Sequence, residues 1–378
     1  MIPYNPIKLF LLIFAIVCVG CKQTEPETTA VINCMFSIEP QTYFTVNSEL
    51  AFTDKSTITT GSIVSWSWTF DDGSTSTLKN PVHTYTAAKT YNVTLTIKDN
   101  LNNTKTYSKK MVLSDPNKGL RRIMYQSSDT VYVCSHRAVH LTIANNDYPE
   151  NSMTGINVAI VNKIDLFECD VRNTIDGVLV LMHDPTVDRT TNGTGTLNKM
   201  YYADVKQLRL KKYTSNTLTT DTIPTLKQVL TASKNKIFIT LDIDGKAPVA
   251  DVLKMVQDMD MVDNVMFFTS LQSDASYLIS NGAIAMPTCY NNAMFNTYIQ
   301  NNLKPLVFQT DNSGYNEEWI SMKTGNIKIY DNVYLLTSTL PTSDNWAQLN
   351  ADLQNGVNIV QTDYPIEMLA YLKSKGKH

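Results

Sequence analysis

The sequence predicts an α/β protein in two parts, a small all-β sandwich followed by a larger (β/α)8 barrel of the TIM type. The chain has 378 residues, which is long enough for two domains, one of them large enough to form a full barrel. Short alternating segments separated by turn residues fill residues 33–114, and beyond residue 117 apolar runs alternate with helical stretches.

The sandwich is expected over residues 33–114. Apolar and polar side chains alternate over residues 64–70 and 91–97, as in strands with one buried face. Turn chemistry separates them at Asp71-Asp72-Gly73 and Asp99-Asn100. This pattern is typical of a small antiparallel sandwich.

The barrel is expected over residues 123–378. Continuous apolar runs, which suit strands buried on both faces of a parallel sheet, occupy residues 131–135, 164–171, 237–243, 265–269, 306–310, 333–336 and 358–361. Helical spacing is found at residues 225–232, 249–259 and 346–354. About eight strand-helix units match a (β/α)8 barrel in size, and a doubly wound sheet is the alternative from the pattern alone.

The composition excludes several classes of function. Apolar residues make up 43% of the chain and aromatic residues 9%, which is ordinary for a globular protein. The formal net charge is -3 and the basic residues form no run. Because nucleic acid is attracted by positive charge, we expect no nucleic-acid partner.

The first 20 residues predict a signal peptide. Lys8 precedes an apolar run over residues 9–19, which is too short to span a bilayer but suits a signal-peptide core. The run ends in Val19-Gly20-Cys21, which resembles a bacterial lipobox, with Cys18 where an aliphatic residue is usual. The resemblance implies lipidation of Cys21 and an exported protein anchored at the bacterial cell envelope, in the outer membrane or the periplasm. The polar, proline-containing residues that follow predict a tether over residues 21–32. A plain signal peptide and a short membrane anchor are the alternatives.

Cysteine usage argues against a thiolate metal site. Of the six cysteines, those outside the signal segment stand at positions 34, 134, 169 and 289, with no Cys-x-x-Cys pair. Cys134 and Cys169 lie inside expected strands, where we expect buried small hydrophobic residues.

Polar residues follow three neighbouring apolar runs, at positions that a barrel would place at its catalytic rim. The run over residues 131–135 ends in His136, and the run over residues 178–182 ends in His183. Between them, Glu168 and Asp170 are spaced so that both carboxylates lie on one face of a strand. The sequence therefore predicts a site with two histidines and two carboxylates.

This set of residues suits phosphodiester cleavage. A divalent ion held by carboxylates neutralises charge on the phosphate, and oxygen ligands without a zinc-type spacing favour Ca²⁺ or Mg²⁺. One histidine can deprotonate the attacking oxygen while the other protonates the leaving alcohol.

The same segments resemble those of the glycerophosphodiester phosphodiesterase family, in the family's order from about residue 131 to residue 372. The matching motifs are His136-Arg137-Ala138, Pro149-Glu150-Asn151, Glu168-Cys169-Asp170-Val171, His183-Asp184-Pro185, Asp188-Arg189-Thr190-Thr191-Asn192-Gly193-Thr194-Gly195 and Gln361-Thr362-Asp363-Tyr364-Pro365. The resemblance implies His136 and His183 as the acid-base pair, Glu168 and Asp170 as metal ligands, and Arg137 as a phosphate contact.

A third ligand and a phosphate-contacting lysine are implied by the segment from Leu241 to Lys246, which resembles the family's Asn-x-Glu-x-Lys strand. One register makes Asp244 the ligand and Lys246 the phosphate contact. The other makes Asp242 the ligand and leaves an aspartate at the lysine position. We favour Asp244 with Lys246, because this register keeps a cation for the anionic substrate.

Several neighbouring residues depart from the family pattern or have open roles. Ala138 replaces a glycine, which could narrow the phosphate approach if the backbone there needs positive φ. His140 is expected to be a loop or substrate-contact residue, and Glu150 either starts a helix or belongs to the site. Arg189 is expected to brace the loop that carries His183.

The sandwich resembles a PKD domain, an immunoglobulin-like fold. The match is carried by residues 66–77 (WSWTFDDGSTST), 80–85 (NPVHTY) and 90–100 (TYNVTLTIKDN), with Asp71 where the family has a glycine. Such domains act as spacers or as carbohydrate- or protein-contacting modules, so the resemblance implies no catalysis there.

Three functions are compatible with these residues. The first is metal-dependent hydrolysis of glycerophosphodiesters to glycerol 3-phosphate and an alcohol. The second is a phospholipase C-like or cyclising phosphodiesterase acting on lipid or inositol phosphodiesters. The third is a surface binding protein whose barrel has lost activity.

Overall fold

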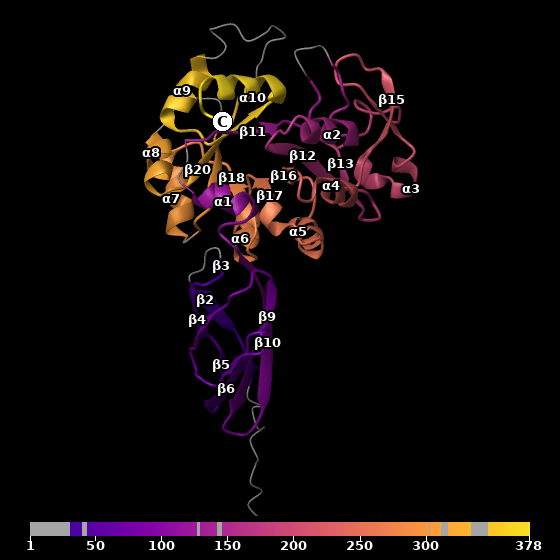
Figure 1. Ribbon diagram of the computed structural model, residues 1–378. Coiled ribbons are helices and arrows are strands. Elements are labelled where there is room, and N and C mark those ends of the chain that lie inside the picture. Colours follow the sequence, from indigo (N-terminus) through magenta and orange to yellow (C-terminus); the bar gives the residue numbers. More distant parts are fainter. Residues whose placement is uncertain are drawn as a thin grey trace, which may run out of the picture.

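The computed structural model describes residues 31–39, 44–126, 129–141, 146–301, 303–310, 317–333 and 347–378. A β-sandwich leads into a barrel, and the long strands β9 (Thr90–Asp99) and β10 (Thr104–Ser114) run from the sandwich toward the barrel (Figure 1). The predicted signal peptide and Cys21, and most of the tether, lie outside the described residues. Within the described part of the chain, no helix has the length and apolar character needed to cross a membrane.

The sandwich has the expected antiparallel architecture, apart from the parallel pairing of its edge strand β3 with β10. A five-stranded sheet of order β3-β10-β9-β6-β7 faces a three-stranded sheet of order β2-β4-β8, and β1 pairs with β5. The remaining strands are β1 (Ile32–Asn33), β2 (Phe36–Glu39), β3 (Phe44–Thr45), β4 (Glu49–Asp54), β5 (Thr57–Ile58), β6 (Ile63–Thr69), β7 (Thr75–Ser76) and β8 (Val82–Thr84). Trp68, Phe52 and Phe70 are buried at its centre and contact one another through their rings.

The second part is a nearly closed barrel of parallel strands in the order β18-β17-β16-β12-β11-β21-β20-β19. Their bounds are β11 (Tyr132–Ser135), β12 (Leu166–Asn173), β16 (Phe238–Asp242), β17 (Val265–Thr269), β18 (Ile284–Pro287), β19 (Val307–Thr310), β20 (Lys328–Asn332) and β21 (Ile359–Thr362). At the seam between β18 and β19, the amide of Cys289 donates to the carbonyl of Gln309 at 2.8 Å, beside a bridge between Thr288 and Gln309. The predicted barrel is thus confirmed, and the doubly wound alternative is wrong.

Helices surround the barrel, as Figure 1 shows. They are α2 (Met153–Val161), α3 (Tyr202–Val205), α4 (Leu226–Ser233), α5 (Val249–Asp258), α6 (Gln272–Ser280), α7 (Asn292–Gln300), α8 (Glu317–Thr324), α9 (Ala347–Asn355) and α10 (Pro365–Ser374), with short 3-10 turns η1 (Leu197–Lys199) and η2 (Val262–Asn264). A capping box of Thr225 and Gln228 starts α4, where the sequence predicts a helix.

Several features of the barrel differ from the sequence expectation. The run over residues 178–182 forms β13 (Leu179–Leu181), which pairs antiparallel with β12 and is not a barrel strand. A second hairpin, β14 (Arg209–Lys211) and β15 (Leu218–Thr222), also lies outside the barrel. Of the strand expected at residues 333–336, only Val333 lies within the described residues, directly after β20, which ends at Asn332. The barrel strand β18 was not among the predicted strands.

The alternation of β12 divides the barrel interior into an apolar base and a polar upper half. Leu166, Glu168 and Asp170 follow one another on the inward face. Leu166 belongs to the apolar cluster at the base, whereas the two carboxylates belong to the cavity above it. The outward residue Cys169 packs against the helices, and as expected Cys134 and Cys169 are buried and free.

The base of the barrel is closed by α1 (Gly119–Tyr125), a helix between the two domains. Its Leu120, Ile123 and Met124 pack against the inward residues of the barrel strands. Arg121 is fully buried and its Nε donates to Asp263 at 2.6 Å. The boundary expected at residue 123 falls inside this helix, whose first turn already packs against the barrel.

Candidate active site

A cavity of about 370 Å³ opens at the carboxyl end of the barrel strands. It is lined by His136, Arg137, Glu168, Asp170, His183, Thr240, Asp242, Phe268, Gln309 and Gln361. The structure therefore brings together at one cavity both predicted histidines, Arg137 and three of the four candidate carboxylates.

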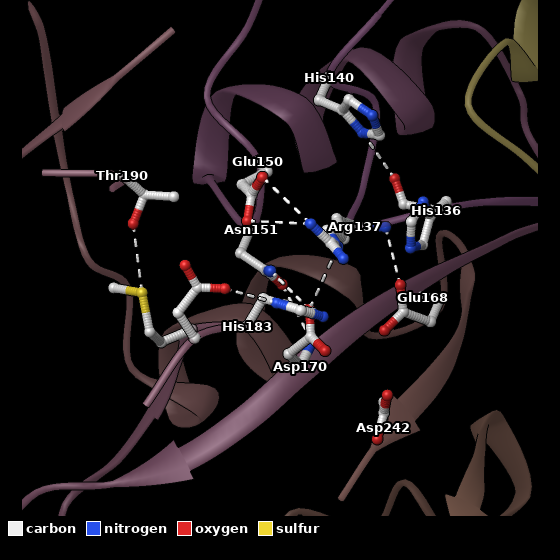
Figure 2. Close-up of polar contacts among 12 residues, drawn as sticks. His136, Arg137, His140, Glu150, Asn151, Glu168, Asp170, His183, Thr190 and Asp242 are labelled. Atoms are coloured by element: carbon white, nitrogen blue, oxygen red, sulfur yellow. Dashed lines mark hydrogen bonds and ion pairs between the residues drawn. The ribbon is translucent and has the colours of Figure 1, made fainter. Parts of the chain in front are cut away.

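Three of these residues form a cluster of carboxylates. Glu168 and Asp170 point inward from β12, and Asp242 ends β16 as the register partner of Asp170. One oxygen from each lies within 4.8 Å of the other two. Figure 2 shows Asp242 on the neighbouring strand, with its carboxylate on the same side as that of Glu168.

Lys246 compensates part of this negative charge. Its Nζ lies 2.6 Å from Asp242 and also donates to Asp170. The side chain reaches both because the backbone turns back after β16, with the amide of Lys246 donating to the carbonyl of Ile243 and Gly245 in the left-handed region at φ 61°.

This turn decides which of the two candidate aspartates, Asp242 or Asp244, reaches the carboxylate cluster. The structure brings Asp242 to the cluster, and it does not bring Asp244, the residue that the favoured register selects. Asp244 faces the next strand, where its carboxylate accepts from the amide and the hydroxyl of Ser270, both at 2.8 Å. Because β16 ends at Asp242, Asp244 has left the strand alternation. The favoured lysine, Lys246, nevertheless reaches the cluster from the turn.

Burial and repulsion perturb the three carboxylates. Burial raises the pKa of Glu168 well above its ordinary value, and the charges of Asp170 and Asp242 raise it further. Burial also acts on Asp170, but the charges of Lys246 and His183 outweigh it and lower the pKa of Asp170. Burial raises the pKa of Asp242 against the opposing charge of Lys246. The cluster therefore holds more negative charge than its neighbours compensate.

The loop after β11 wraps around Glu168. The amide of Arg137 donates to the Glu168 carboxylate and the amide of Ala138 to the Glu168 carbonyl, both at 2.8 Å. Arg137 and Ala138 have left-handed backbone angles, with φ 47° and 60°. The backbone at Ala138 therefore does need a positive φ, an angle that a glycine would adopt without strain. The Ala138 methyl group is buried in the core and does not line the cavity, so it does not narrow the phosphate approach.

Arg137 extends along one wall of the cavity. Its Nη1 lies 3.3 Å from Glu150 and its Nε 3.8 Å from Asp170 (Figure 2). Asn151 fixes Asp170 from the same side, because its amide nitrogen donates to the carboxylate at 2.8 Å and its oxygen accepts from the Asp170 amide at 3.0 Å. These contacts hold the guanidinium where an anionic substrate would enter.

His136 is oriented by an aspartate from the last strand. Ser135 and Thr362 are register partners in β11 and β21, so the next residues, His136 and Asp363, lie side by side. The Nδ1 of His136 is 2.7 Å from Asp363. Burial lowers the pKa of His136 in spite of this carboxylate. Asp363 lies in a motif of the family resemblance, but its contact with His136 was not predicted from the sequence.

His183 is oriented in the same way by its neighbour in the chain. Its Nδ1 lies 2.7 Å from Asp184, and its carbonyl accepts from the guanidinium of Arg172. Arg189 donates to Asp184 at 2.7 Å and to the buried Glu150 at 2.7 and 2.8 Å. Arg189 therefore braces this loop as expected, and Glu150 belongs to the site through its two arginine contacts.

The residues present fit a hard divalent cation. Three converging carboxylates supply only oxygen donors, and Glu168 gains a partner for its negative charge if a cation binds. The residues that would hold the ion are Glu168, Asp170 and Asp242. A second group of three, His136, His140 and Asp363, is already held by its own internal contacts.

Residues 143–333 match the model of the Glycerophosphoryl diester phosphodiesterase family, and this range is just over half of the chain. The chain belongs to this family. The matched range contains Glu168, Asp170, His183 and Asp242, whereas His136 and Asp363 lie on either side of it. The family typically depends on a divalent metal, which agrees with the acidic cluster.

Curated relatives carry the same family name. The mouse glycerophosphodiester phosphodiesterase 1 is 36% identical over 125 residues, which are 32% of this chain and 36% of the mouse protein. A Bacillus subtilis glycerophosphodiester phosphodiesterase is 37% identical over 82 residues, which are 22% of this chain and 26% of that protein. The chain thus spans little more than a third of the length of the mammalian relative that it matches.

Solved structures of the family share the fold. A glycerophosphoryl diester phosphodiesterase from Parabacteroides distasonis superposes with a TM-score of 0.60 at 21% identity, covering 68% of this chain and 93% of that one. A phosphodiesterase from Oleispira antarctica, solved with the product sn-glycerol-3-phosphate, superposes with a TM-score of 0.51 at 19% identity, covering 65% and 97%. The barrel is therefore the glycerophosphodiester phosphodiesterase barrel, and the sandwich, whose residues 35–113 match the PKD domain model, is a PKD domain.

Proposed function

We propose that the barrel hydrolyses glycerophosphodiesters, releasing glycerol 3-phosphate and an alcohol. The observation that supports this function is the pairing of two histidine-aspartate pairs with a carboxylate cluster at one cavity. Membership of the family and the glycerol-3-phosphate bound by the Oleispira antarctica enzyme agree with this substrate class.

A divalent ion held by Glu168, Asp170 and Asp242 would supply charge neutralisation at the phosphate oxygens. Binding of such an ion would also release Lys246 from its contacts with Asp170 and Asp242, so that its ammonium becomes available to the anionic substrate. Arg137 already lines the cavity and would contribute a second positive charge to the phosphate.

The two histidines would divide the proton transfers. In each, the Nδ1 hydrogen is held by an aspartate, so Nε2 is the atom that exchanges a proton. The lowered pKa of His136 favours the neutral imidazole, which suits the base that takes a proton from the attacking water. His183 would then donate its proton to the leaving alcohol oxygen as the phosphorus-oxygen bond breaks.

The test is product analysis on a panel of glycerophosphodiesters, phospholipids and inositol phosphodiesters, followed by ³¹P NMR with Ca²⁺, Mg²⁺ or chelator. We expect glycerol 3-phosphate and the free alcohol, and loss of turnover in chelator. His136→Ala and His183→Ala serve as inactive controls. Cyclic phosphate or phosphorylated headgroup as the product would instead favour the phospholipase C-like alternative, and no turnover with any substrate would favour the binding protein.

We also propose that the protein is exported and anchored to the cell envelope by a lipid on Cys21, with the PKD domain as a spacer that contacts carbohydrate or protein. The support is the apolar run before Val19-Gly20-Cys21 and the position of the sandwich between this segment and the barrel. Metabolic labelling with a palmitate analogue should mark the parent protein and leave Cys21→Ser unlabelled. Labelling of both proteins would contradict the anchor.

A further inference from the structure

His140 is a fully buried histidine directly behind the active site. Its ring packs between His136, at 5.8 Å between centroids, and Tyr213, at 4.4 Å. Tyr213 comes from the loop of the β14–β15 hairpin, and its amide donates to the backbone carbonyl of Tyr148. The amide of Tyr148 in turn donates to the backbone carbonyl of His140. His140 is therefore covered on the side away from the cavity. It does not line the cavity, so its position does not favour a direct contact with the substrate.

Both ring nitrogens of His140 face oxygen atoms that only accept hydrogen bonds. Nδ1 lies 2.9 Å from the carbonyl oxygen of His136, as Figure 2 shows. Nε2 lies 3.4 Å from Oδ1 of Asp363. In the described part of the chain Nε2 makes no hydrogen bond, so its contact with Asp363 is electrostatic. A neutral imidazole has a single N–H and would turn a lone pair toward one of these oxygens, whereas an imidazolium turns an N–H toward each.

The Asp363 carboxylate is thus shared by two histidines. The same oxygen, Oδ1, receives Nδ1 of His136 at 2.7 Å and faces Nε2 of His140. We infer that His140 is a positioning residue that carries both ring protons and acts through Asp363 to orient His136 and to limit its basicity. The inference deepens the proposed function, since it assigns a role in the same proton transfer.

The second histidine provides an independent parallel. Asp184, which orients His183, is also held by a cation on its far side, namely Arg189. Each histidine-aspartate pair is therefore contacted from behind by a third side chain, the permanent cation Arg189 for His183 and His140 for His136. Burial works against ionisation of Asp363, but its contacts with His136 and His140 outweigh burial and hold its pKa well below the ordinary value.

The sign of the effect on His136 follows from the charges around it. Asp363 raises the pKa of His136, and the positive charge of His140 opposes that effect. Removing the charge of His140 therefore raises the pKa of His136. Other ionisable groups that interact with this cluster include Arg137, Glu150, Tyr213 and Tyr364.

The kinetic test compares two variants with the parent. In His140→Asn the side-chain amide nitrogen can replace Nδ1 at the His136 carbonyl but cannot reach Asp363. In His140→Gln the amide can replace Nε2 at Asp363 without a charge. We expect His140→Asn to lower kcat/KM by about 10- to 100-fold and to move the acidic limb of its pH profile, which reports the base His136, to higher pH. His140→Gln should recover part of the rate but keep the shifted profile, because a polar contact with Asp363 returns and the charge does not.

A double mutant separates positioning from general packing. If His140 acts through Asp363, adding His140→Asn to Asp363→Asn should lower kcat/KM no more than about twofold further. Losses that multiply in the double mutant, or an unshifted pH profile in a folded His140→Asn protein, would overturn the inference.

A measurement on the unmodified chain does not depend on activity. Protein labelled with ¹⁵N-histidine should show two protonated ring nitrogens for His140 at neutral pH, with signals assigned by substituting the other histidines one at a time. A neutral tautomer for His140 would refute the doubly protonated state. Absence of phosphodiesterase activity would refute the proposed function. The protonation of the two His140 ring nitrogens could still be measured in that case.

Discussion

The Nζ atom of Lys246 lies 2.6 Å from the Asp242 carboxylate, four residues earlier in the chain, and it also contacts Asp170. Burial alone would lower the pKa of Lys246, but the charges of Asp170 and Asp242 raise it. In the metal-free protein this ammonium is therefore the cation that separates the carboxylates.

Replacing this lysine should destabilise the metal-free protein. We expect Lys246→Met to lower the free energy of unfolding by about 3 kcal/mol in chelator, because buried carboxylates lose their partner. Lys254→Met is the matched control, since Lys254 pairs with Asp258 at the same spacing but on the surface. That control should change stability by less than about 0.5 kcal/mol. Equal effects in chemical denaturation would contradict a structural role for the Lys246 contacts.

Glu168→Gln should have opposite effects on stability with and without metal. Glu168 has a raised pKa when folded, so in chelator its unfolded form ionises first and stability falls as pH rises from about 4.3 through the folded pKa. The glutamine removes this loss, and its oxygen can still accept from the Arg137 amide. Added Ca²⁺ or Mg²⁺ should stabilise the parent by about 2.7 kcal/mol at a hundredfold excess over Kd and the variant by much less. Thermal melts across pH measure both effects, and equal metal stabilisation would exclude Glu168 as a ligand.

Arg189→Lys should lower turnover without unfolding the protein. Arg189 bridges Glu150 and Asp184 through several N–H groups, and a lysine ammonium cannot keep both contacts in the same plane. We expect kcat to fall about 10-fold, since His183 loses the support behind Asp184. Arg122→Lys, on an exposed helix position, is the control. Parent-like kcat in a folded Arg189→Lys protein would show that the bridge does not matter for turnover.

A second pair of buried carboxylates predicts a pH-dependent stability unrelated to catalysis. Burial and the neighbouring Asp352 raise the pKa of Asp331 to about 8, and burial raises that of Asp352 to about 6. Both acids have raised pKa values when folded, so stability should fall as pH rises from about 4 to 8. Asp352→Asn should flatten this slope and stabilise the protein at pH 8 by on the order of 2 kcal/mol, whereas the fully exposed Asp260→Asn should not. An unchanged slope in urea titrations would contradict the pairing.

Removing the PKD domain should preserve turnover and cost some stability. Val112 of β10 packs in the barrel core and touches Gly282, where an added Cβ would lie 2.6 Å from the Val112 side chain. A variant lacking residues 1–114 should therefore keep the parent kcat on soluble substrates but lose about 2 kcal/mol from the exposed contact. A large loss of kcat with the barrel still folded would mean that the sandwich contributes to the site.

Much of the site follows from the sequence because strand alternation and strand ends set it. Glu168 and Asp170 share a face by spacing alone. In a closed barrel the first and last strands are neighbours, so the position of Asp363 after β21 could have predicted its contact with His136. That inference needs the register between distant strands, which local patterns do not contain.

Other features depend on where a strand stops, which the sequence leaves open. By their spacing, Asp242 and Asp244 would point to the same face of a continuous strand. Because β16 ends at Asp242, only Asp242 remains on the inward face. Likewise the apolar run before His183 has the composition of a barrel strand, yet Leu179–Leu181 pairs antiparallel with β12. The contacts of Lys246 and His140 arise from turns with positive φ, and the spacing of apolar residues in the sequence does not predict such turns.

Helix α1 has a consequence for how such domains can be exchanged. It belongs to the connection between the two folds, yet Leu120, Ile123 and Met124 fill the bottom of the barrel and Arg121 is anchored beneath it. A barrel whose chain began at β11, without α1, would lack the side chains that fill its base. The unit that can be replaced by another N-terminal module therefore ends before Gly119, and Asp115 to Lys118 is the segment where a foreign partner could be joined.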